Sequence, residues 1–157
     1  MEQDVEQAVP RWRDIAARKR ADREQELLRY DSWRIDKDPP KGTVDVSYLS
    51  LTKLNDTERA IVHSDATSLV ALIRKRKYMA IDVLTAFAKV AVATQDLTNC
   101  LSEVFLNDAF IRAQELDKYL EDTGNVVGPL HGLPVSIKDH IKIEGIDTST
   151  GYIGKLV

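Results

Sequence analysis

The sequence is poor in several features that mark common classes of protein. Its 157 residues contain one cysteine, Cys100, so no disulfide can form within the chain, which argues against a disulfide-stapled secreted fold. No apolar run approaches the length of about 18 residues that a membrane helix needs. The start, Met1–Asp4, lacks the basic-then-apolar order of a secretory signal. We therefore expect a cytoplasmic chain with no membrane partner.

The chain also has little net charge and few aromatic residues. The net charge is only -3 and aromatic residues make up 6% of the chain, whereas nucleic-acid-binding domains usually carry a basic excess. We therefore expect no nucleic-acid partner. The three histidines show no metal-ligand spacing, so we expect neither a metal nor a cofactor; they are His63, His131 and His140.

What the chain does have is enough apolar sequence for a core. Hydrophobic residues make up 43% and charged residues 30% of a length that suits one domain. We expect Cys100 to be a small core residue and Trp12 and Trp33 to be packing anchors.

Residues 1–41 are unusually charged, with ten acidic and ten basic side chains. Apolar residues recur in them at three- or four-residue spacing, which predicts a helix from Pro10 to about Tyr30; they are Val5, Val9, Trp12, Ile15, Ala16, Leu27 and Leu28. Asp38–Gly42 then breaks the helix. We interpret residues 1–41 as a charged helical extension that packs one stripe on the remaining protein, with a partner-binding helix as the alternative.

Residues 43–122 have the pattern of successive helices, with one strand among them. Asn55 or Asp56 can cap the first helix, Ser64 the second and Asn107 the last, which Gly124 ends. The expected elements are helices over 58–62, from 64 to the cations 74–77, over 80–94 and from 107, and a strand over 100–105. The cations at a helix end complement its dipole, although they also suit a localisation signal or a phosphate site.

The last thirty residues hold the strongest functional signal. Gly128–Pro134 is a turn with two glycines and two prolines, and it leads into Val135–Asp139, whose alternation predicts a strand. Lys138 would lie at the end of this strand. Either its ammonium reaches solvent, or burial keeps the amine neutral and able to accept a proton. The residues alone leave both readings open.

The stretch from Gly128 to Asp139, followed by Gly145–Tyr152, resembles the lysine-bearing part of the amidase signature family. The similarity is greatest to its acetamidase-like branch from fungi, and it extends over residues 44–157. The resemblance implies an α/β fold, a large mixed sheet covered by helices, of which this chain supplies the early helices and first strands. It also implies hydrolysis of a small amide by a Ser–cis-Ser–Lys triad, with no cofactor.

By motif match, Lys138 takes the position of the catalytic lysine, and Asp139 that of an acidic residue supporting it. The family's Gly/Ser-rich signature, which carries both serines, has no counterpart in the chain: neither Ser136 nor Ser149 matches it. We therefore expect residues 42–157 to be the N-terminal portion of an amidase domain, truncated before that signature and inactive alone. The alternative is a non-catalytic helical interaction module or the product of a gene fragment.

Overall fold

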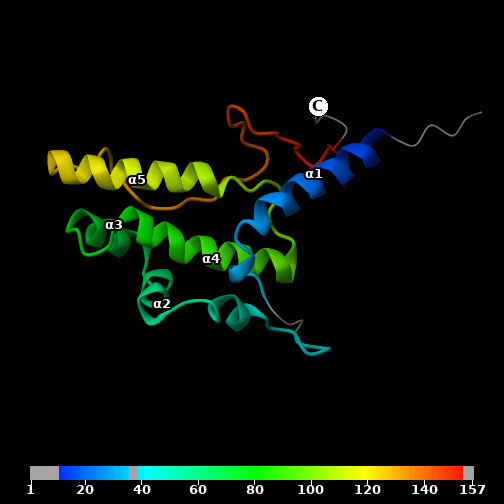
Figure 1. Ribbon diagram of the computed structural model, residues 1–157, viewed down its shortest axis with the longest axis horizontal. Coiled ribbons are helices and arrows are strands. Elements are labelled where there is room, and N and C mark those ends of the chain that lie inside the picture. Colours follow the sequence, from blue (N-terminus) through cyan, green and yellow to red (C-terminus); the bar gives the residue numbers. More distant parts are fainter. Residues whose placement is uncertain (1–10, 36–38, 154–157) are drawn as a thin grey trace, which may run out of the picture. The chain divides into compact units, whose positions relative to one another are not determined.

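The computed structural model describes residues 11–35 and 39–153, and the regular structure within them is helical (Figure 1). Five α-helices and two short 3-10 helices follow one another along these residues: α1 (Arg11–Leu28), η1 (Asp31–Trp33), η2 (Ser47–Leu51), α2 (Asp56–Val62), α3 (Ala66–Arg74), α4 (Ala80–Thr98) and α5 (Leu106–Thr123). The chain divides into two compact units. We call them the lysine unit (Met1–Arg29, Ser102–Val104 and Ser136–Val157) and the helical unit (Tyr30–Leu101 and Phe105–Val135).

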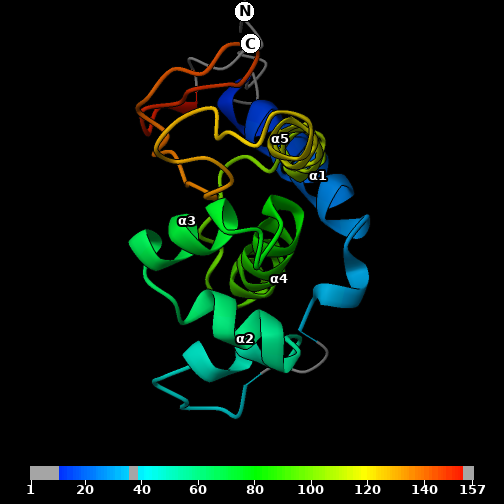
Figure 2. The same ribbon diagram turned by 90° about the vertical axis from the view of Figure 1, so that its left-hand side faces the viewer.

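The helical unit is organised around α4. Figures 1 and 2 show α5 running back alongside α4, with α2 and α3 on its other sides. The side chains that meet between these helices are aliphatic, and each stabilises the fold by about 1.5–3 kcal/mol when fully buried. The main cluster consists of Ile61, Leu69, Ile73, Val83, Ala86 and Leu120.

Local hydrogen bonds explain where these helices begin. Asn55 caps α2 in a reciprocal pair: its side chain accepts from the Glu58 N–H at 2.9 Å, and the Glu58 carboxylate accepts from the Asn55 N–H at 2.9 Å. The cap of α3 is Asp65, whose carboxylate accepts from the Ser68 N–H. The prediction of Ser64 was therefore wrong, because its hydroxyl donates to the Ala60 carbonyl instead.

The ends of α4 and α5 are set partly by tertiary contacts. At the start of α4 the Asp82 carboxylate accepts from the Met79 N–H at 3.2 Å, and Asp117 of α5 accepts from the N–H groups of Ala80 and Ile81 at 2.6 and 3.0 Å. Arg76, one of the four cations at the end of α3 and just after it, donates to the Leu120 carbonyl at the end of α5. Gly124 follows α5 with φ +69°, as predicted for a helix stop.

The two expected strands are absent from the described residues, where the one β-bridge joins Ile143 and Ile146. A strand exists only through hydrogen bonds to a neighbour, and alternation along one segment does not supply that neighbour. The first expected strand, residues 100–105, is irregular and connects α4, which continues to Thr98, with α5, which begins at Leu106 instead of Asn107. Cys100 is exposed, so its prediction as a core residue was wrong.

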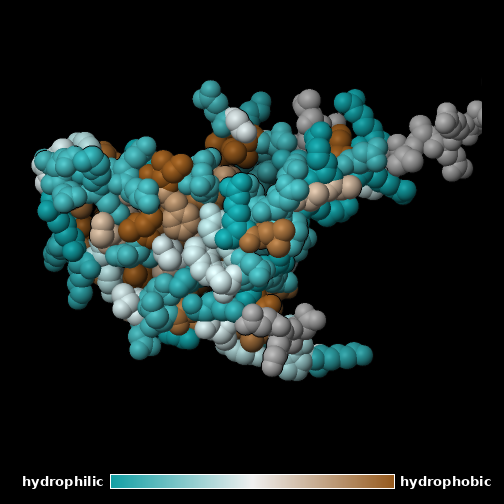
Figure 3. All heavy atoms as spheres, viewed as in Figure 1, coloured by the Kyte–Doolittle hydropathy of each residue, from teal (hydrophilic) through white to brown (hydrophobic). Residues whose placement is uncertain are grey.

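In the lysine unit, α1 confirms the predicted charged helix. Ile15, Ala16 and Leu27 are buried, whereas Trp12 (48% exposed) and Leu28 (56%) are not, so the predicted stripe is narrower than expected. Charged residues cover the remaining surface of α1, which is mostly teal in Figure 3. The expected contributions of Val5, Val9 and Pro10 lie outside the described residues.

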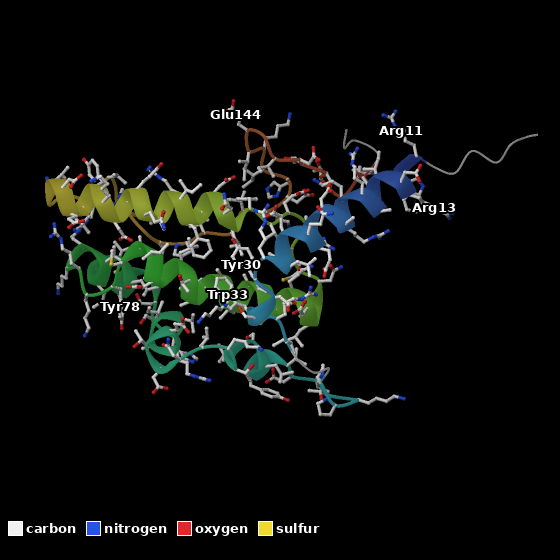
Figure 4. All side chains as sticks on the ribbon, viewed as in Figure 1. Arg11, Arg13, Tyr30, Trp33, Tyr78 and Glu144 are labelled. Carbon is white, nitrogen blue, oxygen red and sulfur yellow. The ribbon has the colours of Figure 1, made fainter. Side chains whose placement is uncertain are left out.

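The second tryptophan is a packing anchor, as predicted. In the helical unit Trp33 stacks on Tyr30 with ring centroids 4.9 Å apart, and Phe110 of α5 lies 6.2 Å from Trp33 (Figure 4). Arg34, the next residue, pairs with Asp96 of α4 at 2.8 Å. These contacts attach the segment that follows α1 in sequence to α4 and α5.

Candidate functional site

The turn before the lysine segment is pressed against the core of the helical unit. Gly132 has φ +75°, and a Cβ there would lie 2.9 Å from the Ala80 Cβ and 3.2 Å from Ile73 Cδ1. Only glycine combines this backbone with so close an approach. The turn is therefore fixed on α3 and α4, and the glycine spacing noted in the sequence has a structural cause.

His131, in the same turn, is a residue whose environment the sequence did not reveal. Its side chain is 3% exposed, and its Nδ1 accepts from the Val127 N–H at 3.2 Å, so the proton of the neutral ring resides on Nε2. Nε2 is buried and has no hydrogen-bond partner among the described residues. Burial lowers the pKa of His131 from its ordinary 6.5, although the Asp117 charge acts in the opposite direction. His131 is therefore a neutral core residue.

Lys138 lies in the irregular segment that follows this turn in sequence. Its side chain is exposed, and no hydrogen bond or ion pair engages its ammonium among the residues that the structure describes. Its carbonyl accepts from the Ile141 N–H at 2.9 Å, which turns the chain immediately after the lysine. Val135 and Ile137 are 63% and 45% exposed, so the apolar face of the expected strand is uncovered.

Asp139 closes the loop that Lys138 begins. Its two carboxylate oxygens accept from the Ser149 N–H at 3.0 Å and the Ser149 hydroxyl at 2.6 Å. The Ser149 oxygen in turn accepts from the Gly151 N–H at 3.0 Å. The hydrogen bonds from Ser149 hold the pKa of Asp139 below its usual 3.8. We call this arrangement the Asp139–Ser149 clasp.

The clasp gives Ser149 a structural role, which its isolation in the sequence did not indicate. Its hydroxyl donates to Asp139, so it is not joined to Lys138 as a nucleophile would be to its base. Ser136 is exposed, and among the described residues it forms no hydrogen bond with Lys138. The described residues therefore present Lys138 at the start of a closed loop, without a serine engaged by it.

The described part of the chain lacks two further features. No group of three or more His, Cys, Asp or Glu side chains there gathers closely enough to hold a metal ion. None of its helices has the length and apolarity that crossing a bilayer requires.

Comparison with known proteins locates the chain's relatives. Residues 82–155 match the family model described as Amidase. The chain is 38% identical to an acetamidase of Aspergillus oryzae and 39% identical to a Schizosaccharomyces pombe protein named as an amidase, in each case over 92% of this chain. These alignments cover 26% and 27% of the two relatives, so the chain spans about a quarter of their length.

A solved structure agrees with the sequence comparisons. The fold matches a fatty acid amide hydrolase with a TM-score of 0.84 and 29% identity, over 93% of this chain and 26% of that one. The helical arrangement described above is thus the arrangement found in part of a much longer enzyme.

Proposed function

Because residues 82–155 belong to the amidase family, we propose that this chain supplies the lysine-bearing part of a hydrolase that cleaves the C–N bond of an amide. The observation that carries the proposal is the position of the family match. It includes Lys138, the Asp139–Ser149 clasp and the turn that precedes them. Homology to named amidases over nine-tenths of the chain supports it.

In the proposed mechanism Lys138 is the base of a Ser–cis-Ser–Lys triad. Its neutral amine accepts a proton from a bridging serine, which takes one from the nucleophilic serine as that oxygen attacks the amide carbonyl. Collapse of the tetrahedral adduct breaks the C–N bond, and the returned proton leaves on the amine. Water then hydrolyses the acyl-serine in the reverse sequence of proton transfers, which regenerates the enzyme.

The two serines of this mechanism come, in our proposal, from sequence outside these 157 residues. Ser149 is occupied by Asp139, and Ser136 lies two residues from Lys138 without contacting it. We therefore propose that the chain alone does not hydrolyse amides. This follows because a base without a nucleophile cannot form an acyl-enzyme.

The exposure of Lys138 also indicates that further segments are needed to complete the site. A lysine serves as a base near neutral pH only when its amine loses water or faces other cations. The amine has not lost its water among the described residues, because the Lys138 side chain is exposed there. We propose that the covering segments also bring the serines, so that desolvation of the base and assembly of the triad occur together.

The substrate we propose is a linear amide with a small acyl group. One similar protein is named an acetamidase and another a fatty acid amide hydrolase, and both names denote linear acyl chains on an amide nitrogen. The identity of 38% to the acetamidase favours the shorter chain as the first substrate to test.

The test is a chimera in which these 157 residues replace the aligned part of the Aspergillus oryzae acetamidase. We expect the chimera to release ammonia from acetamide. Lys138→Ala should lower kcat by a factor of about 1,000 or more, because base catalysis and nucleophile activation are lost together.

The matched control is Lys142→Ala, which removes an exposed lysine four residues further along the same loop. It should leave the rate within about twofold, since surface charges contribute little. Equal rates for the Lys138→Ala and unchanged chimeras would refute the assignment of Lys138 as the base.

A further inference from the structure

A single ammonium ties α1 to two distant segments of the lysine unit. Lys19 Nζ lies 2.7 Å from a Glu103 carboxylate oxygen and 3.1 Å from an Asp147 carboxylate oxygen. The Lys19 side chain is 20% exposed, and those of Glu103 and Asp147 are 25% and 35% exposed, so none of the three is a free surface charge. Figure 1 shows α1 beside the loop that carries Asp147.

The two carboxylates of this cluster stabilise the charged form of Lys19. Burial would lower the pKa of Lys19, but hydrogen bonds and the two carboxylate charges outweigh it and raise the pKa above 10.5. Lys19 therefore keeps its charge throughout the neutral range. Without it, two carboxylates on different segments would face one another with no cation between them, and their repulsion would favour separation.

The cluster joins the clasp through a short stretch of chain, with one residue between Asp147 and Ser149. Asp147 precedes Ser149, and Ser149 is held by Asp139, the residue after Lys138. The loop from Lys138 to Ser149 is thus closed at its base by Asp139 and attached to α1 near the same point by Lys19. Glu144 projects from the far tip of this loop (Figure 4), away from both attachments.

We infer that Lys19 is a positioning residue for Lys138: its bridge to Glu103 and Asp147 fixes the loop on which the lysine is presented. The charged helix α1 then helps to hold Lys138 in position. Lys19 lies outside the stretch that matches the family model, residues 82–155, whereas Glu103 and Asp147 lie within it. The catalytic consequence of this role rests on the proposed function, whereas its structural consequence does not.

The structural consequence can be measured by hydrogen exchange on the full 157-residue chain. Lys19→Met removes the charge but keeps most of the aliphatic stem. We expect exchange of the backbone amides within 140–152, including those of Ser149 and Gly151, to rise about fivefold or more, because the loop opens locally more often. Lys19→Arg should restore protection, since the guanidinium can serve both carboxylates.

Arg20→Met is the matched control, because Arg20 is the next residue of α1, carries the same charge and is exposed. It should leave exchange in the loop unchanged. If Lys19→Met also leaves it unchanged, or if both variants raise it equally, the positioning role is wrong.

The catalytic consequence is read in the acetamidase chimera. Lys19→Met should lower kcat about tenfold while KM stays within about twofold, because a misplaced base slows the chemical step more than it weakens binding. Adding Asp147→Asn should cause little further loss, as both changes break one bridge. A kcat unaffected by Lys19→Met would overturn the inference even if Lys138→Ala abolishes turnover. A chimera inactive in every form would instead refute the proposed function. The hydrogen-exchange result would still show whether Lys19 fixes the loop.

Discussion

The two units of this chain hold their structure by different means. In the helical unit, hydrogen bonds along α2 to α5 satisfy the backbone locally, and aliphatic residues such as Ile61, Ile73 and Val83 are fully buried. In the lysine unit, residues 136–152 form no helix or strand, and turn hydrogen bonds together with side-chain oxygens hold their backbone. Ile137 and Ile141 of this segment are 45% and 49% exposed.

The difference shows what each kind of segment needs from the remaining sequence. A helix completes its hydrogen bonds within itself, so it can form wherever one apolar face is covered. An extended segment leaves alternate N–H and C=O groups to be paired by a neighbour. The lysine segment therefore depends on specific polar contacts and on other segments to cover its apolar side chains. We expect mutations in the helical unit to change global stability and mutations in the lysine segment to act mainly on local structure.

The largest effect should come from the turn packed on the helical core. Gly132→Ala places a methyl group 2.9 Å from the Ala80 Cβ at a φ of +75°, which combines overpacking with backbone strain. We expect it to lower the free energy of unfolding by about 3 kcal/mol. Urea denaturation followed by far-UV circular dichroism would measure the loss.

Gly128→Ala is the control, because a Cβ there meets nothing within 4 Å and φ is not positive. It should change the free energy of unfolding by less than about 1 kcal/mol. Similar losses for the two variants would show that the turn is not pressed on α3 and α4 as described.

An intermediate effect should appear as pH dependence of the helical unit. Because burial lowers the pKa of His131 in the folded state, the unfolded chain binds a proton first as the pH falls below 6.5. Stability should therefore decrease below pH 6.5, by at most about 1.4 kcal/mol per pH unit, until the folded state is protonated as well.

His131→Asn tests this assignment. Its side-chain oxygen can still accept from the Val127 N–H, but the group cannot titrate. The variant should lose the part of the pH dependence that arises between pH 6.5 and the lowered pKa. If urea denaturation shows the same pH dependence for both proteins, His131 is not the titrating group.

The smallest effect on global stability should come from the clasp. Asp139→Ala should change the free energy of unfolding by less than about 0.5 kcal/mol, since the segment contributes little to a core. Exchange of the Ser149 amide should nevertheless rise, because its acceptor is gone. In the unchanged chain, the lowered pKa of Asp139 means that the clasp persists above 3.8 and is lost only as the pH falls through that lowered value.

Glu144→Ala serves as the control for the clasp, as Glu144 is an exposed carboxylate at the tip of the same loop. It should leave the Ser149 amide unaffected. A loss of global stability with Asp139→Ala comparable to that of Gly132→Ala would contradict the division drawn between the units.

The sequence predicted the helices better than the extended segments, for a physical reason. Asn55 and Glu58 are three residues apart and determine a cap by themselves, and Gly124 ends a helix by its own conformational freedom. The alternation over Val135–Asp139 predicted a strand but could not supply a partner strand, and the described residues show no strand there.

The site was predicted only in part. Relatives over most of the chain confirm the family that the motif indicated. The roles of Lys138 as the base and Asp139 as its support stay predictions. Contacts between distant residues were not predictable, because spacing reports only neighbours. Asp117 at the start of α4, Lys19 at Asp147 and the burial of His131 all depend on tertiary packing.

The most direct test of the account asks whether position 138 needs a base or only a positive charge. In the acetamidase chimera, Lys138→Arg keeps the charge but holds a guanidinium that does not lose its proton in the working pH range. We predict that this variant releases ammonia from acetamide at less than about 1% of the rate of the unchanged chimera, close to Lys138→Ala. A rate for Lys138→Arg near that of the unchanged chimera would contradict the assignment, since it would show that Lys138 acts as a charge and not as the base.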